Sequence, residues 1–277
     1  MRGGDDAVGS IRATAADAAA AAGALIRASF GKLTIVDGVA AHDLKLRLDR
    51  EAETEIITLV RRRFPADGIL SEEAGYLPGE SPFLWITDPL DGTVNFFHGI
   101  PMFCTCVSCH LLGNGDAGQR LATLPDGRAV GDALAAVVYC PLSEELFTAG
   151  SGCGAALNGR PLHPAPLTDF SAAIVSISLN AHEANLPFAG RLVPRLAARA
   201  RKVRCFGSTA LEIALVAAGR TGAFVQMGTN LWDFAAAACV LKEAGGVVDA
   251  REYAPGRWKI TASNPGIAEE MRRLVEE

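Results

Sequence analysis

The chain has 277 residues, of which 49% are hydrophobic and 21% are charged, a composition that excludes a disordered or fibrous protein. Its 26 Lys and Arg against 31 Asp and Glu leave a formal net charge of −5, which disfavours general binding to a nucleic-acid backbone. Seven cysteines form no regular framework, so we expect a reducing, cytoplasmic location. We also expect no signal peptide and no membrane-spanning segment.

The first half of the sequence predicts two helices followed by several strands. An Ala-rich run over 13–28, ending at Phe30-Gly31, predicts the first helix. Apolar residues recur at helical spacing over 49–64, just before Pro65, and predict the second. Short apolar runs bounded by turn residues predict strands at 83–87, 103–112, 133–139 and 145–149.

After about residue 150 the predicted strands and helices alternate. The strands are expected at 173–178, 202–206, 223–226 and 247–249, and the helices at 186–199, 210–218 and 232–244. This alternation indicates a sheet covered by helices. We therefore divide the chain into an N-terminal part, 1–149, and a C-terminal part, 150–277.

The stretch from Trp85 to Phe96 is the most informative for chemistry. A strand delivers Asp88 at its end, Pro89 is expected to stop the strand ladder, and Asp91-Gly92 turns the chain into a short helix that begins near Thr93. Two carboxylates in apolar surroundings repel each other unless a cation neutralises them, and a hard divalent metal is the simplest partner. The free N–H groups of Gly92 and Thr93 at the helix start suit a phosphate.

Two further acidic segments stand beside apolar runs. Glu72 and Glu73 follow Ile69-Leu70, and Asp233 opens a strongly apolar helix. Taken singly, Glu72 and Glu73 are typical of a solvated turn. Asp233 is typical of a helix N-terminus, where the helix dipole stabilises negative charge, and Asp91-Gly92 is typical of a plain turn. Their joint presence changes the interpretation.

Together these segments resemble the inositol monophosphatase family of Mg²⁺-dependent, lithium-sensitive phosphatases. The family's D-P-[IL]-D-G-T-x-N-F signature stands at 88–96, and its W-D-x-A-A signature stands at 232–236, followed by Glu-Ala-Gly-Gly at 243–246. Its G-E-E motif appears as Ser71-Glu72-Glu73. Order and spacing match over nearly the whole chain. The resemblance implies an α/β fold with α-β-α-β-α layers, an N-terminal antiparallel sheet with helices, a C-terminal mixed sheet with helices, and a homodimer.

The resemblance also implies a site. In such proteins the metals are held by residues that correspond here to Glu72, Asp88, the backbone oxygen of Leu90, Asp91 and Asp233. These ligands are all oxygen atoms, which suit Mg²⁺. Asp49 and Thr93, together with Glu72, are expected to activate a water for attack on phosphorus. The implied substrate contacts are Asp91, Gly92, Thr93, Gly207, Thr209, Gln226 and Asp233.

Two of these positions depart from the family's pattern and bear on the substrate. Thr209 stands where the family usually has Ala, and Gln226 stands where inositol-specific members have a Glu that contacts the sugar hydroxyls. We expect a phosphomonoesterase acting on a small polyol or sugar phosphate, most simply myo-inositol monophosphate. The alternatives are fructose 1,6-bisphosphate, 3′-phosphoadenosine 5′-phosphate and histidinol phosphate.

Two other patterns suggest competing functions. Cys104, Cys106, Cys109 and His110 could indicate zinc, but on a strand the first two face one way and Cys109 the other, so buried small apolar residues are favoured. Arg191, Arg195 and Arg199 recur on one helix face, where a solvated or subunit-facing surface is favoured. The alternative from another class is a non-catalytic protein that binds RNA or a transcription complex.

Overall fold

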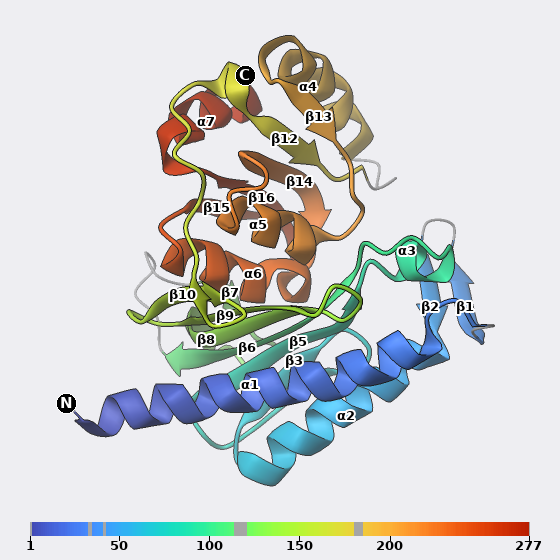
Figure 1. The fold of residues 1–277 in the computed structure, drawn as a ribbon. Helices are drawn as coiled ribbons and strands as arrows, with labels where there is room; N and C mark the ends of the chain where they lie inside the picture. Colours follow the sequence, from blue (N-terminus) through green and yellow to red (C-terminus); the bar gives the residue numbers. More distant parts are fainter. Residues whose placement is uncertain (1, 33–34, 41–42, 114–120, 180–184, 277) are drawn as a thin grey trace.

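The structure of the chain, a computed structural model, describes residues 2–32, 35–40, 43–113, 121–179 and 185–276. Figure 1 shows five layers in which helices and sheets alternate. A pair of helices covers the outer face of a large sheet, a second pair lies between the large sheet and a smaller one, and a third pair covers the far face of the smaller sheet. The predicted α-β-α-β-α architecture is confirmed.

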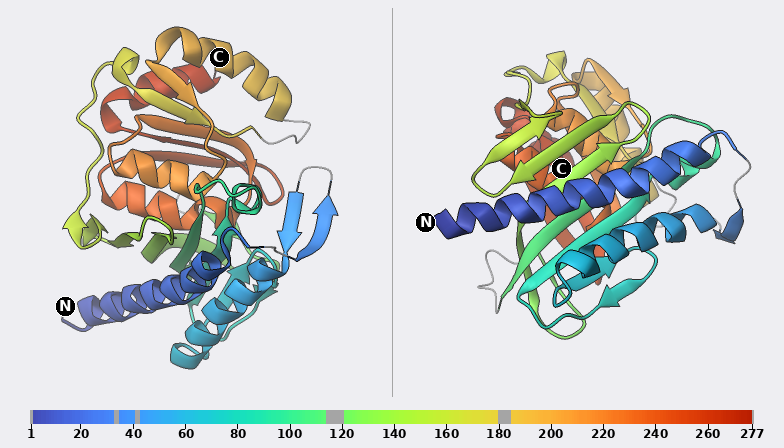
Figure 2. Two further views of the ribbon diagram at one scale, coloured as in Figure 1. Left: turned by 45° about the vertical axis from the view of Figure 1, so that its right-hand side comes forward. Right: turned by 60° about the horizontal axis from the view of Figure 1, so that its bottom comes forward.

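Helices α1 (Arg2–Ser29) and α2 (Arg47–Arg63) form the outer layer and lie across one face of the large sheet (Figure 2). Their inward stripes are apolar at helical spacing, and the buried residues include Ile11, Ala15, Ala18, Ala22, Ala52, Ile56 and Val60. Small Ala side chains let α1 approach the sheet closely. Both predicted helices are confirmed, and α1 begins well before its Ala-rich run.

The large sheet has the strand order β11-β10-β9-β8-β6-β5-β3-β4, and β7 pairs with β8. Its pairs are antiparallel except β3 with β5, which run parallel. The strands are β3 (Gly68–Ser71), β4 (Gly75–Leu77), β5 (Phe83–Asp91), β6 (Cys104–Gly113), β7 (Ala122–Thr123), β8 (Ala129–Cys140), β9 (Glu145–Gly150), β10 (Gly154–Leu157) and β11 (Arg160–Pro161).

Strand β5 differs from its predicted extent. It was expected to end before Pro89, but it continues to Asp91. The ladder tolerates the proline because its register against β6 shifts between Asp88, which faces Cys106, and Asp91, which faces Cys104. The extra residue in β5 forms a bulge. Pro89 lies within it, where no backbone N–H is needed for pairing with β6.

The smaller sheet has the order β13-β12-β14-β16-β15, in which the first three strands are parallel and the last two pairings antiparallel. A mixed sheet was predicted and is confirmed. Its strands are β12 (Ile174–Ile177), β13 (Lys202–Arg204), β14 (Ala223–Thr229), β15 (Val247–Ala254) and β16 (Arg257–Ser263). The helices around it are α4 (Asn185–Arg199), α5 (Thr209–Ala217), α6 (Leu231–Glu243) and α7 (Ala268–Glu276).

Besides α3 (Thr93–Phe97), four shorter elements complete the described chain. They are the hairpin β1 (Val36–Ala40) and β2 (Asp43–Leu46), which pair antiparallel, and the 3₁₀ turns η1 (Phe170–Ala172) and η2 (Pro265–Ile267). Strands β10 and β11 follow residue 150 but pair within the large sheet. These two strands belong to the C-terminal part by sequence and to the large sheet by pairing. The division into 1–149 and 150–277 therefore stays a prediction.

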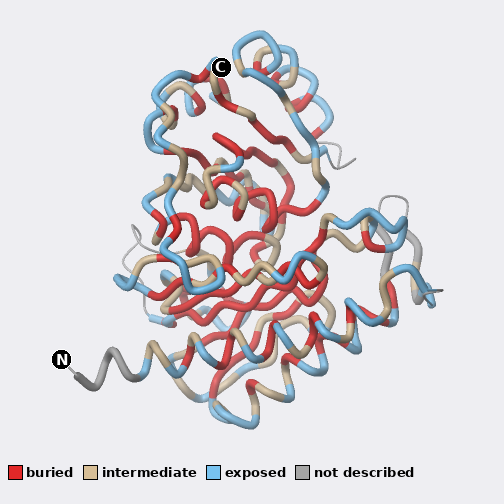
Figure 3. The backbone as a smooth tube through the Cα atoms, viewed as in Figure 1, coloured by how far each residue is buried: buried red, intermediate tan, exposed pale blue. Residues whose placement is uncertain are grey.

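The buried residues follow the layers (Figure 3). One apolar cluster joins both sheets through α5 and α6, with Phe147 contributed by the large sheet and Phe224 by the smaller one. The free energy gained by burying the apolar surface of this shared core is the main contribution that holds the two sheets together. Within the described residues, none of the helices has the length and apolar character needed to cross a membrane.

Candidate active site

The bulged end of β5 places two carboxylates where the two sheets meet. Asp88 is 2% exposed and Asp91 9% exposed. The Leu90 N–H donates to Asp88 Oδ1 at 3.0 Å, and the Leu90 carbonyl accepts from Thr93 Oγ1 at 2.9 Å. Gly92 then turns the chain at φ 96°, a left-handed conformation that favours glycine, into α3 (Thr93–Phe97). The short helix predicted near Thr93 is confirmed.

Asp91 links the two sheets by capping α5. Its Oδ2 accepts from Ser208 Oγ at 2.7 Å and from the Ala210 N–H at 2.7 Å, while its Oδ1 accepts from the Thr209 N–H at 3.1 Å. These donors are the start of a helix more than 110 residues later in the sequence, where N–H groups have no partner within the helix. Oδ1 keeps a further acceptor site, because a carboxylate oxygen has two lone pairs and this one accepts a single hydrogen bond, whereas Oδ2 already accepts two.

Asp233 reaches the same region from the first turn of α6. Its Oδ2 accepts from the Asn230 N–H at 2.8 Å, from Thr229 Oγ1 at 2.8 Å and from Asn230 Nδ2 at 3.3 Å. Arg257 donates in turn to Asn230 Oδ1 at 3.0 Å, which fixes the orientation of that amide. The capping box therefore holds Asp233 through one oxygen only.

Glu72 lies in the turn between β3 and β4 and is held through its neighbours. Glu53, a buried residue of α2, accepts a hydrogen bond from Ser71 Oγ and another from the Glu73 N–H at 2.9 Å, both on Oε1. Asp49, one helical turn before Glu53, accepts from the Leu46 N–H at 2.8 Å. The role of Glu53 was missed from sequence, although its i, i+4 spacing from Asp49 puts both on one helix face.

The carboxylates of this group are electrostatically coupled. Burial raises the pKa of Glu72 well above its usual range, and Asp233 and Asp49 raise it further. Burial likewise raises the pKa of Asp88, with Glu72 and Asp91 adding to the effect. Burial raises the pKa of Asp91 to about 6 against the hydrogen bond from Ser208. Sharing of a low-dielectric region by like charges is a property of functional sites.

The group contains only oxygen ligands and has excess negative charge, so its chemistry fits a hard divalent cation. As the side chains stand, no three Asp, Glu, His or Cys residues within the described ranges lie close enough together to enclose a metal ion. Four of the predicted ligands are thus brought together as an acidic group, with Asp88 and Asp91 buried and Glu72 and Asp233 half-buried, rather than as a closed coordination shell. We call Glu72, Asp88, Asp91 and Asp233 the acidic group below.

The turn at 207–210, which carries the predicted substrate contacts Gly207 and Thr209 and is called the substrate loop below, borders Asp91. Gly207 has φ 80°, and a Cβ atom there would lie 3.1 Å from Asn95, which donates to the Phe206 carbonyl at 2.7 Å. Thr209 Oγ1 donates to Gln226 Oε1 at 2.6 Å. Glu212 was missed from sequence. It accepts from the Gly207 N–H at 3.0 Å, and a lone acid in an apolar helix was the available signal.

The cysteines follow the predicted alternation. Cys104 and Cys106 pack in the core between the sheets, with their Sγ atoms 3.8 Å apart, whereas Cys109 packs on the side of α1 and α2. His110 Nε2 lies 3.0 Å from Ser108 Oγ and Nδ1 lies 3.0 Å from the Gly131 carbonyl oxygen, so the ring is satisfied internally. Burial lowers the pKa of His110 to about 4.

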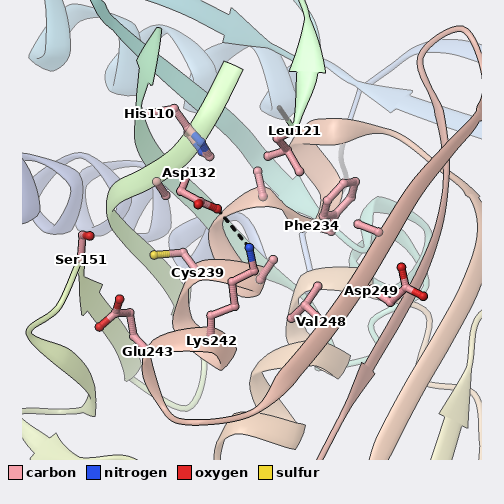
Figure 4. A pocket seen from close by; sticks show the side chains of 14 residues that line it. His110, Leu121, Asp132, Ser151, Phe234, Cys239, Lys242, Glu243, Val248 and Asp249 are labelled. Atoms are coloured by element: carbon pink, nitrogen blue, oxygen red, sulfur yellow. Dashed lines mark hydrogen bonds and ion pairs between the residues drawn. The ribbon is translucent and has the colours of Figure 1, made fainter. Parts of the chain in front are cut away.

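A separate cavity, with a volume of 410 Å³, is lined by residues of α6 such as Phe234, Cys239 and Lys242. Figure 4 shows the side chains that line it. His110 and Phe234 form part of its wall, and the ion pair between Lys242 and Asp132, at 3.0 Å, lies at its edge. None of the acidic group lines it. The cavity is therefore distinct from the candidate site.

The layers define a protein of the α-β-α-β-α class, and the acidic group places several carboxylates between its two sheets. The chain belongs to the inositol monophosphatase family, whose profile matches residues 8–117 and 129–277. Membership of this family supports a phosphatase activity.

Individual relatives agree with this membership. The chain is 35% identical to the inositol-1-monophosphatase of Synechocystis over 271 residues, covering 94% of this chain and 87% of the relative. It is 35% identical over 239 residues to a protein named Nus factor SuhB of Pseudomonas aeruginosa, covering 83% of this chain and 82% of the relative. The crystal structure of the extragenic suppressor protein SuhB of Bartonella henselae superposes with a TM-score of 0.84 at 28% identity, covering 97% of this chain and 99% of that chain.

Proposed function

We propose that this protein is a Mg²⁺-dependent phosphomonoesterase that hydrolyses a small polyol or sugar phosphate, most simply myo-inositol monophosphate. The observation that carries the proposal is the acidic group, in which burial and mutual repulsion raise the pKa of Glu72 and Asp88. Such a group is stable as carboxylates only beside positive charge. Family membership supports the reaction type, and the substrate rests on the resemblance alone.

The residues that would hold Mg²⁺ are Glu72, Asp88, the Leu90 carbonyl, Asp91 and Asp233. When bound, the ions supply Lewis-acid stabilisation of phosphate charge and acidify a water. Asp49 is the proposed base that takes a proton from this water, with the Thr93 hydroxyl orienting it. The water oxygen forms the new P–O bond as the ester P–O bond breaks, and the alcohol leaves with a proton. We assign the phosphate contacts to Gly92 and Thr93, and the alcohol contacts to Gly207, Thr209 and Gln226.

A substrate panel tests this function. Release of inorganic phosphate from myo-inositol 1-phosphate, fructose 1,6-bisphosphate, 3′-phosphoadenosine 5′-phosphate and histidinol phosphate is measured with Mg²⁺ and with EDTA. We expect release from at least one small polyol or sugar phosphate with Mg²⁺ and none with EDTA. Metal-independent release, or none from any substrate, would contradict the proposal.

A non-catalytic nucleic-acid-binding role is less well supported, although relatives carry the name Nus factor. Arg191 and Arg199 lie on the exposed side of α4, but Arg199 is paired with Glu270 at 3.2 Å. The intact acidic group, with Asp49 and Thr93 beside it, favours catalysis.

We further propose a homodimer. Around α3 the side chains of Val94, Phe97 and Ile100 are 49%, 43% and 45% exposed. Three large exposed apolar residues within seven positions of the chain are uncommon on a monomer surface and favour burial against a second copy.

A further inference from the structure

The cavity drawn in Figure 4 lies where the two sheets meet, apart from the acidic group. Its lining residues come from β6 and β8 of the large sheet, from β15 of the smaller sheet and from α6 between the sheets. Its volume of 410 Å³ falls within the range of small-molecule sites in proteins, about 300–1,000 Å³. The cavity is therefore large enough for a compact organic molecule.

The inner wall of this cavity, formed by Leu121, Phe234, Ala235 and Val248, is apolar. Phe234 and Ala235 are 0% and 2% exposed, and Leu121 and Val248 pack against the same apolar cluster. His110 lies beside this wall with each ring nitrogen 3.0 Å from a polar partner, and burial lowers its pKa to about 4. The ring is therefore neutral at pH 7, and a ligand needs an apolar body to match the wall.

The rim of the cavity carries more acids than bases. Among the described residues that line the cavity, the charged ones are Asp132, Glu243 and Asp249 against Lys242, a surplus of two negative charges. The Asp132 and Lys242 side chains are 73% and 50% exposed, which places them at the mouth of the cavity. Asp132 and Asp249 lie on opposite sides of the apolar wall (Figure 4). We call these four charged residues the rim.

The acids of the rim have partners but keep the capacity to accept further hydrogen bonds. Asp132 Oδ1 accepts from Lys242 Nζ at 3.0 Å. The two oxygens of Asp249 each accept once from Arg251, at 3.0 and 2.8 Å. The two oxygens of Glu243 each accept one backbone N–H, at 3.0 and 2.9 Å. Because a carboxylate oxygen has two lone pairs, each of these oxygens can accept from a second donor.

These features favour an ammonium group over an anion. A primary ammonium brings three N–H donors to the carboxylates and offsets the surplus of negative charge. An anion would approach three carboxylates and would find Lys242 already paired with Asp132. The rim therefore sets the sign of the ligand's charge, and the wall sets the character of its body.

We propose that this cavity is a binding site for a small organic amine, whose apolar body lies against the wall and whose ammonium group lies at the rim beside Asp132 and Asp249. The site goes beyond the proposed phosphatase function and does not depend on it, because no member of the acidic group lines the cavity.

Calorimetric titration of the full chain with three probes that share one body tests the ligand class. The probes are 2-phenylethylamine, which is a cation at pH 7, neutral 2-phenylethanol and anionic phenylacetate. Mg²⁺ is present throughout to compete for the acidic group, which also attracts cations. We expect the amine to bind at least about fivefold more tightly than the alcohol, and phenylacetate to bind more weakly than either. The advantage of the amine should shrink as salt is added.

Substitutions in the wall and the rim locate the binding. Val248→Phe fills part of the cavity and should abolish binding of the amine and the alcohol alike. Asp132→Asn removes one carboxylate and should weaken amine binding about threefold, whereas Lys242→Met removes the competing cation and should strengthen it about threefold. Alcohol binding should stay unchanged in both rim variants. Asp17→Asn, which breaks an exposed ion pair on α1, is the matched control and should change neither probe's binding.

Opposite effects of the two rim substitutions on one probe, with the alcohol unaffected, would not arise from impaired folding. Absence of amine binding, or phenylacetate binding as tight as that of the amine, would overturn the proposal. Amine binding that survives both Val248→Phe and Asp132→Asn, or that Asp91→Asn weakens as much as Asp132→Asn does, would place the amine at the acidic group and overturn it equally. Phosphate release is measured separately, so the phosphatase function stands or falls on its own assay.

Discussion

At the scale of single residues, the site depends on side chains that hold the acidic group as much as on its members. Glu53 is the clearest case. It bonds to the residues on either side of Glu72 through one oxygen, so it sets where Glu72 points. Ser208 and the α5 N–H groups do the same for Asp91. At the proposed cation site, side chains anchored in this way would need less ordering on binding.

Replacing Glu53 should weaken Mg²⁺ activation. Glu53→Ala removes the acceptor of two hydrogen bonds, so we expect the Mg²⁺ concentration for half-maximal phosphate release to rise about tenfold. Glu53→Gln keeps an oxygen at that place and should stay close to the wild type. Mg²⁺ titrations of phosphate release check both variants, and equal Mg²⁺ dependence in all three proteins would contradict the assigned role.

Glu212 should make stability depend on pH. Burial raises the pKa of Glu212 to about 7 from its ordinary value of 4.5, so the folded protein binds this proton more tightly than the unfolded chain does. The stability contributed by the protonated group is fully present below about pH 4.5 and is lost as pH rises through about 7.

Glu212→Gln keeps the acceptor for the Gly207 N–H and removes the charge. We expect the free energy of unfolding of the variant to exceed that of the wild type by about 1–3 kcal/mol at pH 8 and to differ little from it at pH 4.5. Urea unfolding in EDTA at the two pH values measures this difference. Glu55→Gln, at an exposed position of α2, is the control, and a pH-independent difference for Glu212→Gln would refute the explanation.

At the scale of elements, the acidic group is assembled by local irregularities in otherwise regular strands and helices. The bulge around Pro89 turns the end of β5 toward the smaller sheet, and Asp91 then caps α5 across the junction. The β5 carboxylate thus serves both as part of the site and as a link between the sheets.

Ser208→Ala tests this link. The substitution removes a buried hydrogen bond of 2.7 Å to a carboxylate, so we expect unfolding free energy to fall by about 1.5–3 kcal/mol. The exposed Ser143, which bonds to Glu145 at 3.2 Å, is the control, and Ser143→Ala should change stability by less than about 0.5 kcal/mol. Equal losses in the two variants would show that Asp91 does not depend on the α5 cap.

Much of this element structure could be predicted from sequence, since long apolar periodicity specifies α1, α2, α6 and the central strands. The proline rule failed at β5 because tertiary pairing placed a bulge there. Strand β16 and helix α7 were not predicted, although Trp258, Ile260 and Ala262 alternate as buried residues. Helix α7 buries only Met271 and Leu274, too few for a clear helical signal.

The site shows a similar division. The members of the acidic group were predicted from three motifs, at 71–73, 88–96 and 232–236, because the residues within each motif are close together in the sequence. The contacts of Glu53 with Ser71 and of Thr209 with Gln226 were not predictable, because each joins residues of different elements, 18 and 17 positions apart. Such pairs are set by packing between elements and not by local spacing.

At the scale of the whole molecule, the two sheets share one apolar core, and the acidic group lies where they meet. Exposed apolar residues around α3 lie close to that junction, because Asn95 of α3 donates to the carbonyl of Phe206, the residue before the substrate loop. A dimer formed through this surface would therefore support the loop beside the site.

Phe97→Ser should separate the proposed dimer. Sedimentation equilibrium is expected to give a mass near twice 29.0 kDa for the wild type and near 29.0 kDa for the variant. Leu111 is exposed to a similar degree, 46%, at the far end of β6, and Leu111→Ser should remain dimeric. A wild-type monomer, or dissociation by both substitutions, would contradict the assigned surface.

The most direct test of the central claim is the rate of Mg²⁺-dependent phosphate release by Asp91→Asn, measured beside Asp132→Asn as an exposed control. Asparagine retains one oxygen acceptor for the α5 donors but removes the negative charge. We predict that Asp91→Asn reduces kcat/KM by at least about a hundredfold on the substrate that the wild type prefers, while Asp132→Asn stays within about twofold. Unchanged turnover in a folded Asp91→Asn variant would contradict the assignment of the acidic group as the catalytic metal site.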